Sequence, residues 1–489
     1  MSNTKKNIGI IGAGLSSLYA ACYLSKNGFN VTMFEKNSMV GGRSQTFEAD
    51  GFKFDMGPSW YWMPELIDGL FTDLGEKRTD YFKLDRLKTS YQVFWDDATS
   101  SKIPSNQKDL DALFDSLETD GAKKLNLFLT DAKTKYDISI KLLENPGLSI
   151  GELIKWEVVK NSFKLDVLKS VNSDVSRRFE SKKARSILNF PVLFLGEMPK
   201  NIPSLYTLMN YADLKLGTWY PKGGMNDLAA ALGKIAVQNG VQINLNSSVQ
   251  GILSKNDQVD GITADGIEHH FDFVISGADY HFTEQKLLPE KYRKYSESYW
   301  DKRKMAPSSL IFYIGIDKKI EKLEHHNLFF DEDLNDHGEE IYKDPQWPKK
   351  PLFYVCAPSK TDPKVAPEGH ENLFFLMPIA TGIKDNDQIR EEYFQLMIDR
   401  LKLRTGVDIS ESIVYKRSFC ISDFKSEYNS FKGNAYGLAN TLKQTANLKP
   451  KMKSKLKNLY YCGQLTVPGP GIPPALISGK IAAKQIMKS

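Results

Sequence analysis

The sequence predicts an α/β fold in which a parallel sheet, built from three separated stretches of chain, carries an inserted α+β part. Residues 7–35 alternate a short apolar strand, a helix and a second strand. Residues 220–290 contain a helix followed by several strands, and residues 459–487 contain a strand and a closing helix. Strands that alternate with helices are typical of a parallel sheet covered by helices. We therefore expect the three stretches to share one sheet.

The composition excludes some classes of protein. The 489 residues are 41% hydrophobic and 26% charged, which is enough apolar material for a sizeable core. The net charge of +5 is small for this length, so we predict no nucleic-acid partner. No apolar run approaches the ~20 residues that span a bilayer, so any membrane contact is expected to be peripheral. The cysteines show no CxxC spacing, which argues against a disulfide framework and fits a reducing cytosol; they are Cys22, Cys356, Cys420 and Cys462.

Two pairs of adjacent histidines, His269-His270 and His325-His326, are expected at the surface. Neighbouring residues of one element point in different directions, so neither pair suits the binding of one metal ion from a single face. We therefore predict no metal site.

The turn after the first strand carries a dinucleotide-binding motif. Gly12 allows a tight turn, and Gly14 leaves room for a pyrophosphate that faces the positive end of the next helix. Glu35 ends the second strand about twenty residues later, where a carboxylate accepts hydrogen bonds from an adenosine ribose and disfavours the 2′-phosphate of NADP. The cofactor contacts predicted here are Gly12, Ala13, Gly14, Leu15, Ser16 and Glu35.

This motif alone is weak, because Ser17 stands where a third glycine is usual. Its continuation, Gly41-Gly42-Arg43, resembles the second part of the FAD signature of glutathione-reductase-like flavoproteins of the amine-oxidase type. There the arginine helps to hold the diphosphate. The resemblance implies FAD, with further contacts from Lys36, Gly42 and Arg43. The alternative is a glycine-rich turn with a solvated arginine.

The same resemblance brings two more segments to the cofactor. Gly57, Pro58 and Ser59 follow a strand-like stretch and would pass beside the isoalloxazine, although the packing of a hairpin end explains them equally well. The backbone at Val249 would meet the adenine.

The last forty residues supply a second glycine-bearing turn. Gly463 follows a strand, and Gly471 and Ile472 stand in a proline-rich turn before a predicted helix over residues 475–487. A helix N-terminus there would stabilise negative charge on the pyrimidine ring of a reduced flavin. The alternative is a proline-stiffened loop before a packing helix.

We predict a discontinuous FAD-binding domain, 1–95, 220–290 and 455–489, and a substrate-binding domain, 96–219 and 291–454. The substrate domain is expected to be helical over 106–211, with strands near 310–316, 352–356, 373–377 and 413–419 and a helix near 387–403. Its many strand aromatics could form a sheet core or line an apolar channel.

Residues 154–185 interleave basic and apolar side chains and run into the apolar stretch 188–195. Basic charge beside apolar surface suits contact with a membrane interface. A stretch rich in basic residues is, however, more often the solvent-exposed face of a helix.

Motifs over nearly the whole chain resemble bacterial-type phytoene desaturases, the carotenoid desaturase branch of the flavin amine-oxidoreductase superfamily. The motifs are Pro221-Lys222-Gly223-Gly224-Met225, residues 278–289, residues 423–444 and, above all, residues 463–473. One departure is Asn447-Leu448-Lys449-Pro450, where the family often has an aromatic residue, arginine and proline. The resemblance implies a Rossmann-like FAD domain of the glutathione-reductase type with an inserted α+β substrate domain.

The implied function is desaturation of phytoene toward lycopene, with a hydride passing from an apolar isoprenoid to the flavin. Quinone or oxygen would reoxidise the flavin. A cytoplasmic enzyme on the inner face of the cell membrane would suit the substrate, and we name no catalytic residue.

Several alternatives stay open. A hydroxycarotenoid 3,4-desaturase and a dehydrosqualene desaturase differ only in substrate. An amine oxidase or a protoporphyrinogen oxidase would share the cofactor. A flavin-free prenyl carrier resembling the Rab GDP-dissociation inhibitors would share only the fold, and the glycine turns argue against it.

Overall fold

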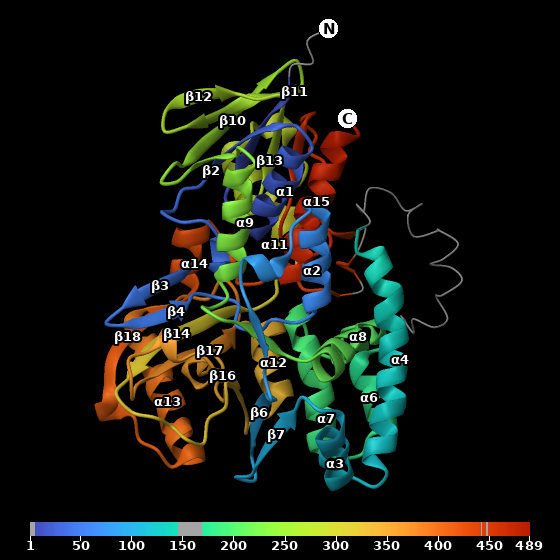
Figure 1. Cartoon of the computed structure of the whole chain (residues 1–489), viewed down its shortest axis with the longest axis vertical. Helices are drawn as coiled ribbons and strands as arrows, with labels where there is room; N and C mark the ends of the chain where they lie inside the picture. Colours follow the sequence, from blue (N-terminus) through green and yellow to red (C-terminus); the bar gives the residue numbers. More distant parts are fainter. Residues whose placement is uncertain (1–4, 145–168, 442, 446–447) are drawn as a thin grey trace.

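The computed structural model describes residues 5–144, 169–441, 443–445 and 448–489. Figure 1 shows an elongated molecule with both termini at one end, beside the parallel sheet. A larger mixed sheet and a group of helices lie side by side at the other end.

The predicted parallel sheet is confirmed, and all three stretches contribute to it. All neighbouring strands pair in parallel. The strand order is β19 (Leu459–Tyr461), β13 (Phe273–Ser276), β1 (Asn7–Ile11), β2 (Asn30–Phe34) and β9 (Gln242–Asn244). The core of this half joins the sheet to four helices, α1 (Leu15–Lys26), α2 (Pro64–Asp73), α9 (Asp227–Gln238) and α15 (Ile472–Met487).

Two glycines let the helices and strands of this half approach closely. A Cβ atom on Gly479 of α15 would lie 2.0 Å from the backbone oxygen of Ser16 in α1. A Cβ atom on Gly277, just after β13, would lie 1.9 Å from Oγ of Ser17. Ser17 therefore fits in place of the third glycine of the motif because the residue opposite it is itself a glycine.

A three-stranded antiparallel sheet lies at the end of the molecule that carries the termini (Figure 1). It consists of β10 (Val249–Lys255), β11 (Gln258–Ala264) and β12 (Ile267–His270). Residues 270–276 do not form one continuous strand, because His270 ends β12 and the strand β13 of the parallel sheet begins only at Phe273. The chain changes sheets there, because the Phe271 N–H donates to Asp260 and the Asp272 N–H donates to Asn7.

The second half is built on a seven-stranded mixed sheet. Its order is β18 (Ile413–Phe419), β14 (Ser308–Ile316), β17 (Glu371–Ile379), β16 (Phe353–Cys356), β15 (His326–Phe330), β6 (Thr89–Trp95) and β7 (Ser100–Pro104). Helix α13 (Asp387–Thr405) packs into the core of one face. The four predicted strands and this helix are confirmed, whereas β15 and α12 (Leu334–Tyr342) were not predicted. Strand β6 belongs to this sheet although it lies within residues 1–95, which we predicted to be part of the FAD-binding domain.

The helical segment predicted over 106–211 is confirmed in its described residues, 106–144 and 169–211. The helices there are α3 (Gln107–Leu117), α4 (Gly121–Leu142), α6 (Val171–Arg178), α7 (Lys182–Asn189) and α8 (Leu208–Tyr211). The described residues also form the short strands β3 (Thr46–Ala49), β4 (Phe52–Asp55), β5 (Leu84–Arg86) and β8 (Trp219–Pro221) and the short helices α10 (Tyr280–Phe282), α11 (Glu297–Asp301) and α14 (Ile421–Tyr428), besides several 3₁₀ and π turns. The basic stretch proposed for membrane contact lies partly outside the described residues, at 154–168. In its described part, Arg178, Lys182 and Lys183 form ion pairs with aspartates.

Replacing Gly479 by alanine should destabilise the protein by about 1–3 kcal/mol, because α1 and α15 must separate to admit the methyl group. Thermal and denaturant unfolding of the purified protein measure the change. The control is Gly69→Ala in α2, where an added Cβ meets nothing within 4 Å. That change should be neutral or stabilise by about 0.5–1 kcal/mol through helix propensity. Equal stability of both variants would contradict the close packing described above.

Candidate functional site

A cavity of about 880 Å³ lies where the two halves of the protein meet. One part of its wall comes from the ends of β1 and β2 and from the turns after them. The opposite part comes from β14, β15, β16 and β17 and from α4, α8 and α12. Segments from both ends of the chain therefore border one space.

The first glycine turn leaves an opening in this wall. Gly12 has a φ of +85°, which favours glycine, and its N–H donates to the Phe34 carbonyl at 2.8 Å. A Cβ atom on Gly14 would meet nothing within 4 Å. A Cβ atom on Gly42 would lie 3.1 Å from Cα of Gly14, so the two turns touch through their backbones. Leu15 and Ser16 also line the cavity at the N-terminus of α1.

Glu35 is buried at the end of β2 and lines the same cavity. Its carboxylate accepts the Ala13 N–H at 2.7 Å and the Asn37 N–H at 2.9 Å. Of the sixteen predicted cofactor contacts, Ala13 alone does not line the cavity. Its backbone holds the carboxylate in place instead.

Lys36, Gly42 and Arg43 line the cavity next to Glu35. The Arg43 guanidinium donates to Ser430 and, at 3.2 Å, to the Asn434 carbonyl, and it lies over the Tyr428 ring. Its Nε is buried without a hydrogen-bond partner. Arg43 thus lines the cavity and keeps a buried donor that no described residue occupies.

Gly57, Pro58 and Ser59 also line the cavity, and Val249 does so at the start of β10. A Cβ atom on Gly57 would lie 2.4 Å from the Arg43 carbonyl oxygen, so the chain passes directly over the Gly41-Gly42-Arg43 turn. The predicted segments therefore lie beside one another.

The C-terminal turn lines the same cavity through Gly463, Gly471 and Ile472. Helix α15 begins at Ile472, three residues before the predicted start at 475, because prolines are well tolerated in the first turn of a helix. Its N-terminal end therefore faces the cavity. The turns near residues 14 and 471 come together from opposite ends of the chain.

These residues fit a bound dinucleotide in three respects. The space in front of Gly14 is open, two helix N-termini face the cavity, and Arg43 offers an unused buried donor. Among the described residues, the charged side chains that line the cavity come from these same segments or from their neighbours; they are Glu35, Lys36, Arg43, Asp279 and Glu427.

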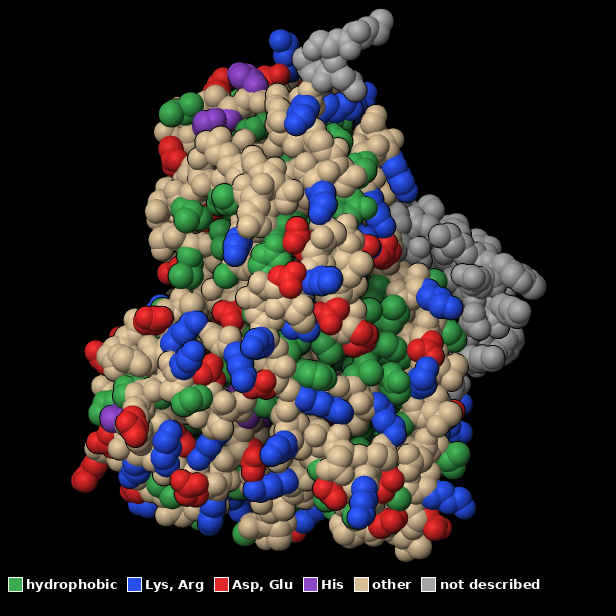
Figure 2. Space-filling view, viewed as in Figure 1, with side chains coloured by type: hydrophobic (Ala, Val, Ile, Leu, Met, Phe, Trp, Pro, Cys, Tyr) green, Lys and Arg blue, Asp and Glu red, His purple; other side chains and the backbone are tan. Residues whose placement is uncertain are grey.

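The rest of the cavity wall is mostly apolar. Figure 2 shows hydrophobic side chains gathered between α2 and α4. The wall there comes from α2, α4, α8 and the segment before α8, and it includes Met63, Ile67, Ile140, Leu142, Leu143, Leu205, Leu208 and Met209. Among the strand aromatics, Phe330, Phe353 and Tyr354 line the cavity, whereas Phe312, Phe329, Phe374 and Phe375 do not. Some strand aromatics therefore pack in the sheet core and others line the cavity, as the two interpretations of the sequence allowed.

His337 is an ionisable residue on the apolar side of the wall. Its Nδ1 accepts the Leu352 N–H at 3.0 Å, and its Nε2 lies 2.9 Å from the Pro378 carbonyl oxygen. Burial lowers the pKa of His337 to about 4, so the ring is neutral and both nitrogens are occupied. His337 has no free lone pair with which to accept a proton from a ligand.

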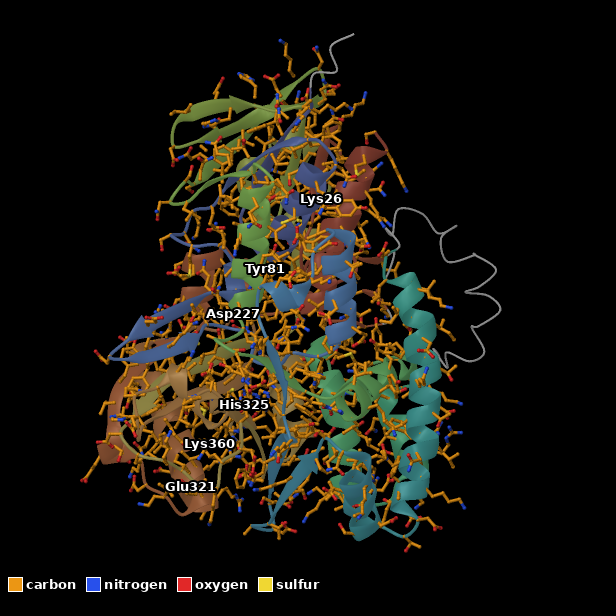
Figure 3. The ribbon with its side chains drawn as sticks, in the orientation of Figure 1. Lys26, Tyr81, Asp227, Glu321, His325 and Lys360 are labelled. Atoms are coloured by element: carbon orange, nitrogen blue, oxygen red, sulfur yellow. The ribbon has the colours of Figure 1, made fainter. Side chains whose placement is uncertain are left out.

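The expectation of surface histidines was wrong for His325 and His326. Their side chains are 3% and 0% exposed, and His325 lies inside the half that carries the mixed sheet (Figure 3). His325 precedes β15, which begins at His326, so the alternation of strand side chains does not separate the two rings. His269 is half-buried against Phe34, and His270 is exposed.

A comparison with protein families settles the class of this site. Residues 13–487 match the family described as flavin containing amine oxidoreductase. The chain belongs to this family. Its cofactor is accordingly a flavin, FAD, and the protein is a flavin-containing oxidoreductase.

Curated relatives place this oxidoreductase in the carotenoid desaturase branch of the family. It is 36% identical to a carotenoid 3,4-desaturase of Haloarcula japonica over 99% of this chain and 98% of the relative. It is 31% identical to a 4,4′-diapophytoene desaturase (4,4′-diaponeurosporene-forming) of Staphylococcus aureus strain Newman, over 98% of each chain. A solved oxidoreductase of Methanosarcina mazei shares the fold, with a TM-score of 0.66 and 16% identity over 99% of this chain and 100% of that one.

Sequence reasoning missed several polar groups near the cavity of this oxidoreductase. The Tyr206 hydroxyl lies 2.9 Å from Oγ1 of Thr445, and Asn440 lines the wall with an unpaired Oδ1. Lys449, in the stretch that departs from the family pattern, is buried beside Gly469 and has no hydrogen-bond partner among the described residues, and burial lowers its pKa to about 7. These residues come from irregular segments, which periodicity does not reveal.

Replacing Gly14 by leucine should reduce the FAD content of the purified oxidoreductase at least about tenfold, because the side chain fills the space in front of the turn. The flavin-to-protein absorbance ratio measures this loss. The matched control is Gly69→Leu, an exposed position where an added Cβ also meets nothing. Full FAD content in the Gly14 variant would show that the cofactor does not occupy this opening.

Proposed function

We propose that this protein desaturates an acyclic carotenoid, with FAD held between the two glycine turns. The observation that carries the proposal is the continuity of one cavity, which has glycine turns at one side and an apolar wall at the other. An apolar chain can thus reach a cofactor bound at the turns without leaving the cavity. The oxidation of a polar amine would not require so large an apolar wall.

In this proposal each turn has a separate role toward FAD. Gly12, Gly14 and the N-terminus of α1 receive the diphosphate, and Glu35 accepts hydrogen bonds from the ribose. Arg43 and the segment 57–59 border the middle of the cofactor. Gly471 and the N-terminus of α15 would lie at the pyrimidine end.

FAD, when bound, would supply the oxidising chemistry by accepting a hydride, that is two electrons and one proton, while the second hydrogen of the substrate leaves as a proton. The chain has to position a hydrocarbon whose C–H bonds are not acidic. The apolar wall orients that hydrocarbon and excludes water. His337 cannot serve as a base because both of its nitrogens are occupied. The proposal therefore names no side chain as a base.

The relatives favour one reaction within this class. The sequence motifs predict phytoene as substrate and a product close to lycopene. The curated relatives carry the names carotenoid 3,4-desaturase and diapophytoene desaturase, which match the alternatives better than that first prediction. We propose 3,4-desaturation of an acyclic carotenoid as the principal reaction, and desaturation of a diapophytoene as the second candidate.

Pigment analysis in bacteria tests this assignment. Strains that accumulate phytoene, 4,4′-diapophytoene, lycopene or a hydroxylated acyclic carotenoid would each express the protein. The expected product carries an additional 3,4 double bond, so it has lost two hydrogen atoms and absorbs at longer wavelength. The Gly14→Leu variant is the inactive control. Conversion of phytoene to lycopene would select the first prediction, and no pigment change in any strain would contradict the function.

We further propose that the substrate enters from a membrane surface beside α4, with quinone or oxygen as the electron acceptor. Ile140, Leu142 and Leu143 are half-buried and line the cavity at the end of this helix. Glu144 follows Leu143, and its carboxylate accepts a hydrogen bond from Nζ of Lys484 in α15 at 2.6 Å. This ion pair connects the end of α4 to α15. Within the described residues, no helix is both long and apolar enough to cross a bilayer. The proposed location is the inner face of the cell membrane.

Placing glutamates at both Leu142 and Leu143 should weaken binding to lipid vesicles about tenfold, because two apolar side chains no longer enter the interface. Co-sedimentation with vesicles of phosphatidylcholine and phosphatidylglycerol measures the bound fraction. Leu127→Glu is the matched control, since Leu127 is 60% exposed on the same helix but does not line the cavity. An equal loss in both variants would argue against a specific entry site.

A further inference from the structure

Three side chains with metal-binding atoms meet behind the wall of the large cavity. One ring nitrogen of His325, one ring nitrogen of His326 and the sulfur of Cys356 all lie within 4.8 Å of one another. All three side chains are buried. Cys356 is the last residue of β16, and His326, the first residue of β15, pairs directly with it in the sheet. The backbone register therefore fixes this cluster.

The hydrogen bonds of His326 leave one ring nitrogen unused. The Tyr354 hydroxyl donates its only proton to Oγ of Ser59 at 3.0 Å. Its oxygen can then accept the Nδ1–H of His326, which lies 2.6 Å away. In that tautomer the lone pair resides on Nε2, which is buried and has no hydrogen-bond partner among the described residues. Trp60 stacks on this ring at a centroid distance of 4.0 Å and fixes its plane.

His325 follows the same pattern. Its Nδ1 lies 2.7 Å from Oγ1 of Thr361, and its Nε2 is buried without a hydrogen-bond partner in the part of the chain that the structure describes. A hydrogen bond on one ring nitrogen that leaves the other free is the arrangement that orients histidine ligands around a metal ion. Two adjacent buried imidazoles with unsatisfied Nε2 atoms are otherwise unfavourable, because a buried polar atom without a partner costs free energy.

A small cavity of about 20 Å³ adjoins this cluster and is lined by His325, Cys356, Asp55 and Ser59. This volume can hold one water-sized particle. Zn–N distances near 2.0 Å and a Zn–S distance near 2.3 Å place ligand atoms closer together than 4.8 Å, so metal binding requires the three side chains to draw together slightly. The cluster thus offers both ligands and space.

From this geometry we propose that His325, His326 and Cys356 form a binding site for a thiophilic metal ion, Cu⁺ or Zn²⁺. Imidazole and thiolate are the ligands that these two ions prefer. On binding, the metal–sulfur bond replaces the S–H bond of Cys356, and the proton passes to solvent. No electron is transferred in this step.

The charge balance distinguishes the two ions. Two neutral imidazoles and one thiolate leave a neutral site with Cu⁺ and a site of charge +1 with Zn²⁺. A buried net charge is costly unless it is paired. The Asp55 carboxyl group lines the small cavity and accepts the N–H groups of Met225 and Asn226, so it is placed to balance the second charge of Zn²⁺.

Metal titration of the purified FAD-loaded protein tests the proposal without an activity assay. Cu⁺ would be delivered under anaerobic conditions from a chromophoric chelator, and Zn²⁺ from a separate chelator. The number of metal ions bound per protein would be measured after desalting. We expect one equivalent of one ion to be retained. Cys356→Ser should lower the affinity at least about tenfold, and Thr361→Val about 10–100-fold, because the latter removes only the partner that orients His325.

Cys420→Ser is the matched control, because Cys420 is an equally buried thiol at the N-cap of α14, where serine is a good cap. This variant should bind metal as the parent does. FAD content and the thermal midpoint of each metal-free variant show whether it is folded, and Thr361→Val keeps the test decisive if Cys356→Ser fails to fold. Failure to retain either ion, or equal retention by the Cys356 and Cys420 variants, would overturn the proposal.

Discussion

The open space in front of Gly14 is the feature on which the rest of the structure depends. It exists because several glycines let backbone segments touch without side chains between them. Gly42 lies against Gly14, Gly57 passes over the carbonyl of Arg43, and Gly479 brings α15 against α1. A side chain at any of these positions would separate the segments that border the cavity. The close approach of backbone to backbone thus sets the shape of the cofactor end.

Hydrogen bonds next to these glycines join the two halves of the molecule around one cavity. Arg43 reaches across to Ser430 and Asn434, and the Tyr313 hydroxyl of β14 donates to the Met56 carbonyl at 2.7 Å. Hydrophobic burial stabilises each half separately, through one core around the parallel sheet and others around the mixed sheet. The cavity lies between these cores, where apolar side chains remain partly uncovered. An apolar ligand is therefore the ligand whose burial this arrangement favours most.

Much of the fold could be predicted from local sequence patterns. The strands around Gly12 and before Gly463, helix α13 and the glycine turns all have strong periodicity or fixed spacing, because each depends on short-range geometry. The change of sheet at Phe271, strand β15 and helix α12 could not be predicted in this way. The residues around Phe271 and in β15 are placed by pairing with strands distant in the sequence, and a single sequence carries no signal of such pairing.

The residues of the candidate site also divide into those that local sequence patterns reveal and those that only tertiary packing brings together. The glycines and Glu35 could be named because a diphosphate and a ribose require those residue types at a fixed spacing. Residues such as Asn440 and Tyr206 are ordinary polar side chains whose position depends on tertiary packing. The adjacent pair His325-His326 misled the prediction for a related reason. Only the start of β15 at His326 and its pairing with Cys356 turn both rings inward.

The most direct test of the central claim is anaerobic mixing of the FAD-loaded protein with an acyclic carotenoid in detergent, without any electron acceptor. The account predicts that the visible flavin band bleaches, that one double bond forms per flavin reduced, and that an aliphatic amine causes no bleaching. Bleaching by the amine but not by the carotenoid would contradict the account, because the apolar wall would then not deliver the substrate to the flavin.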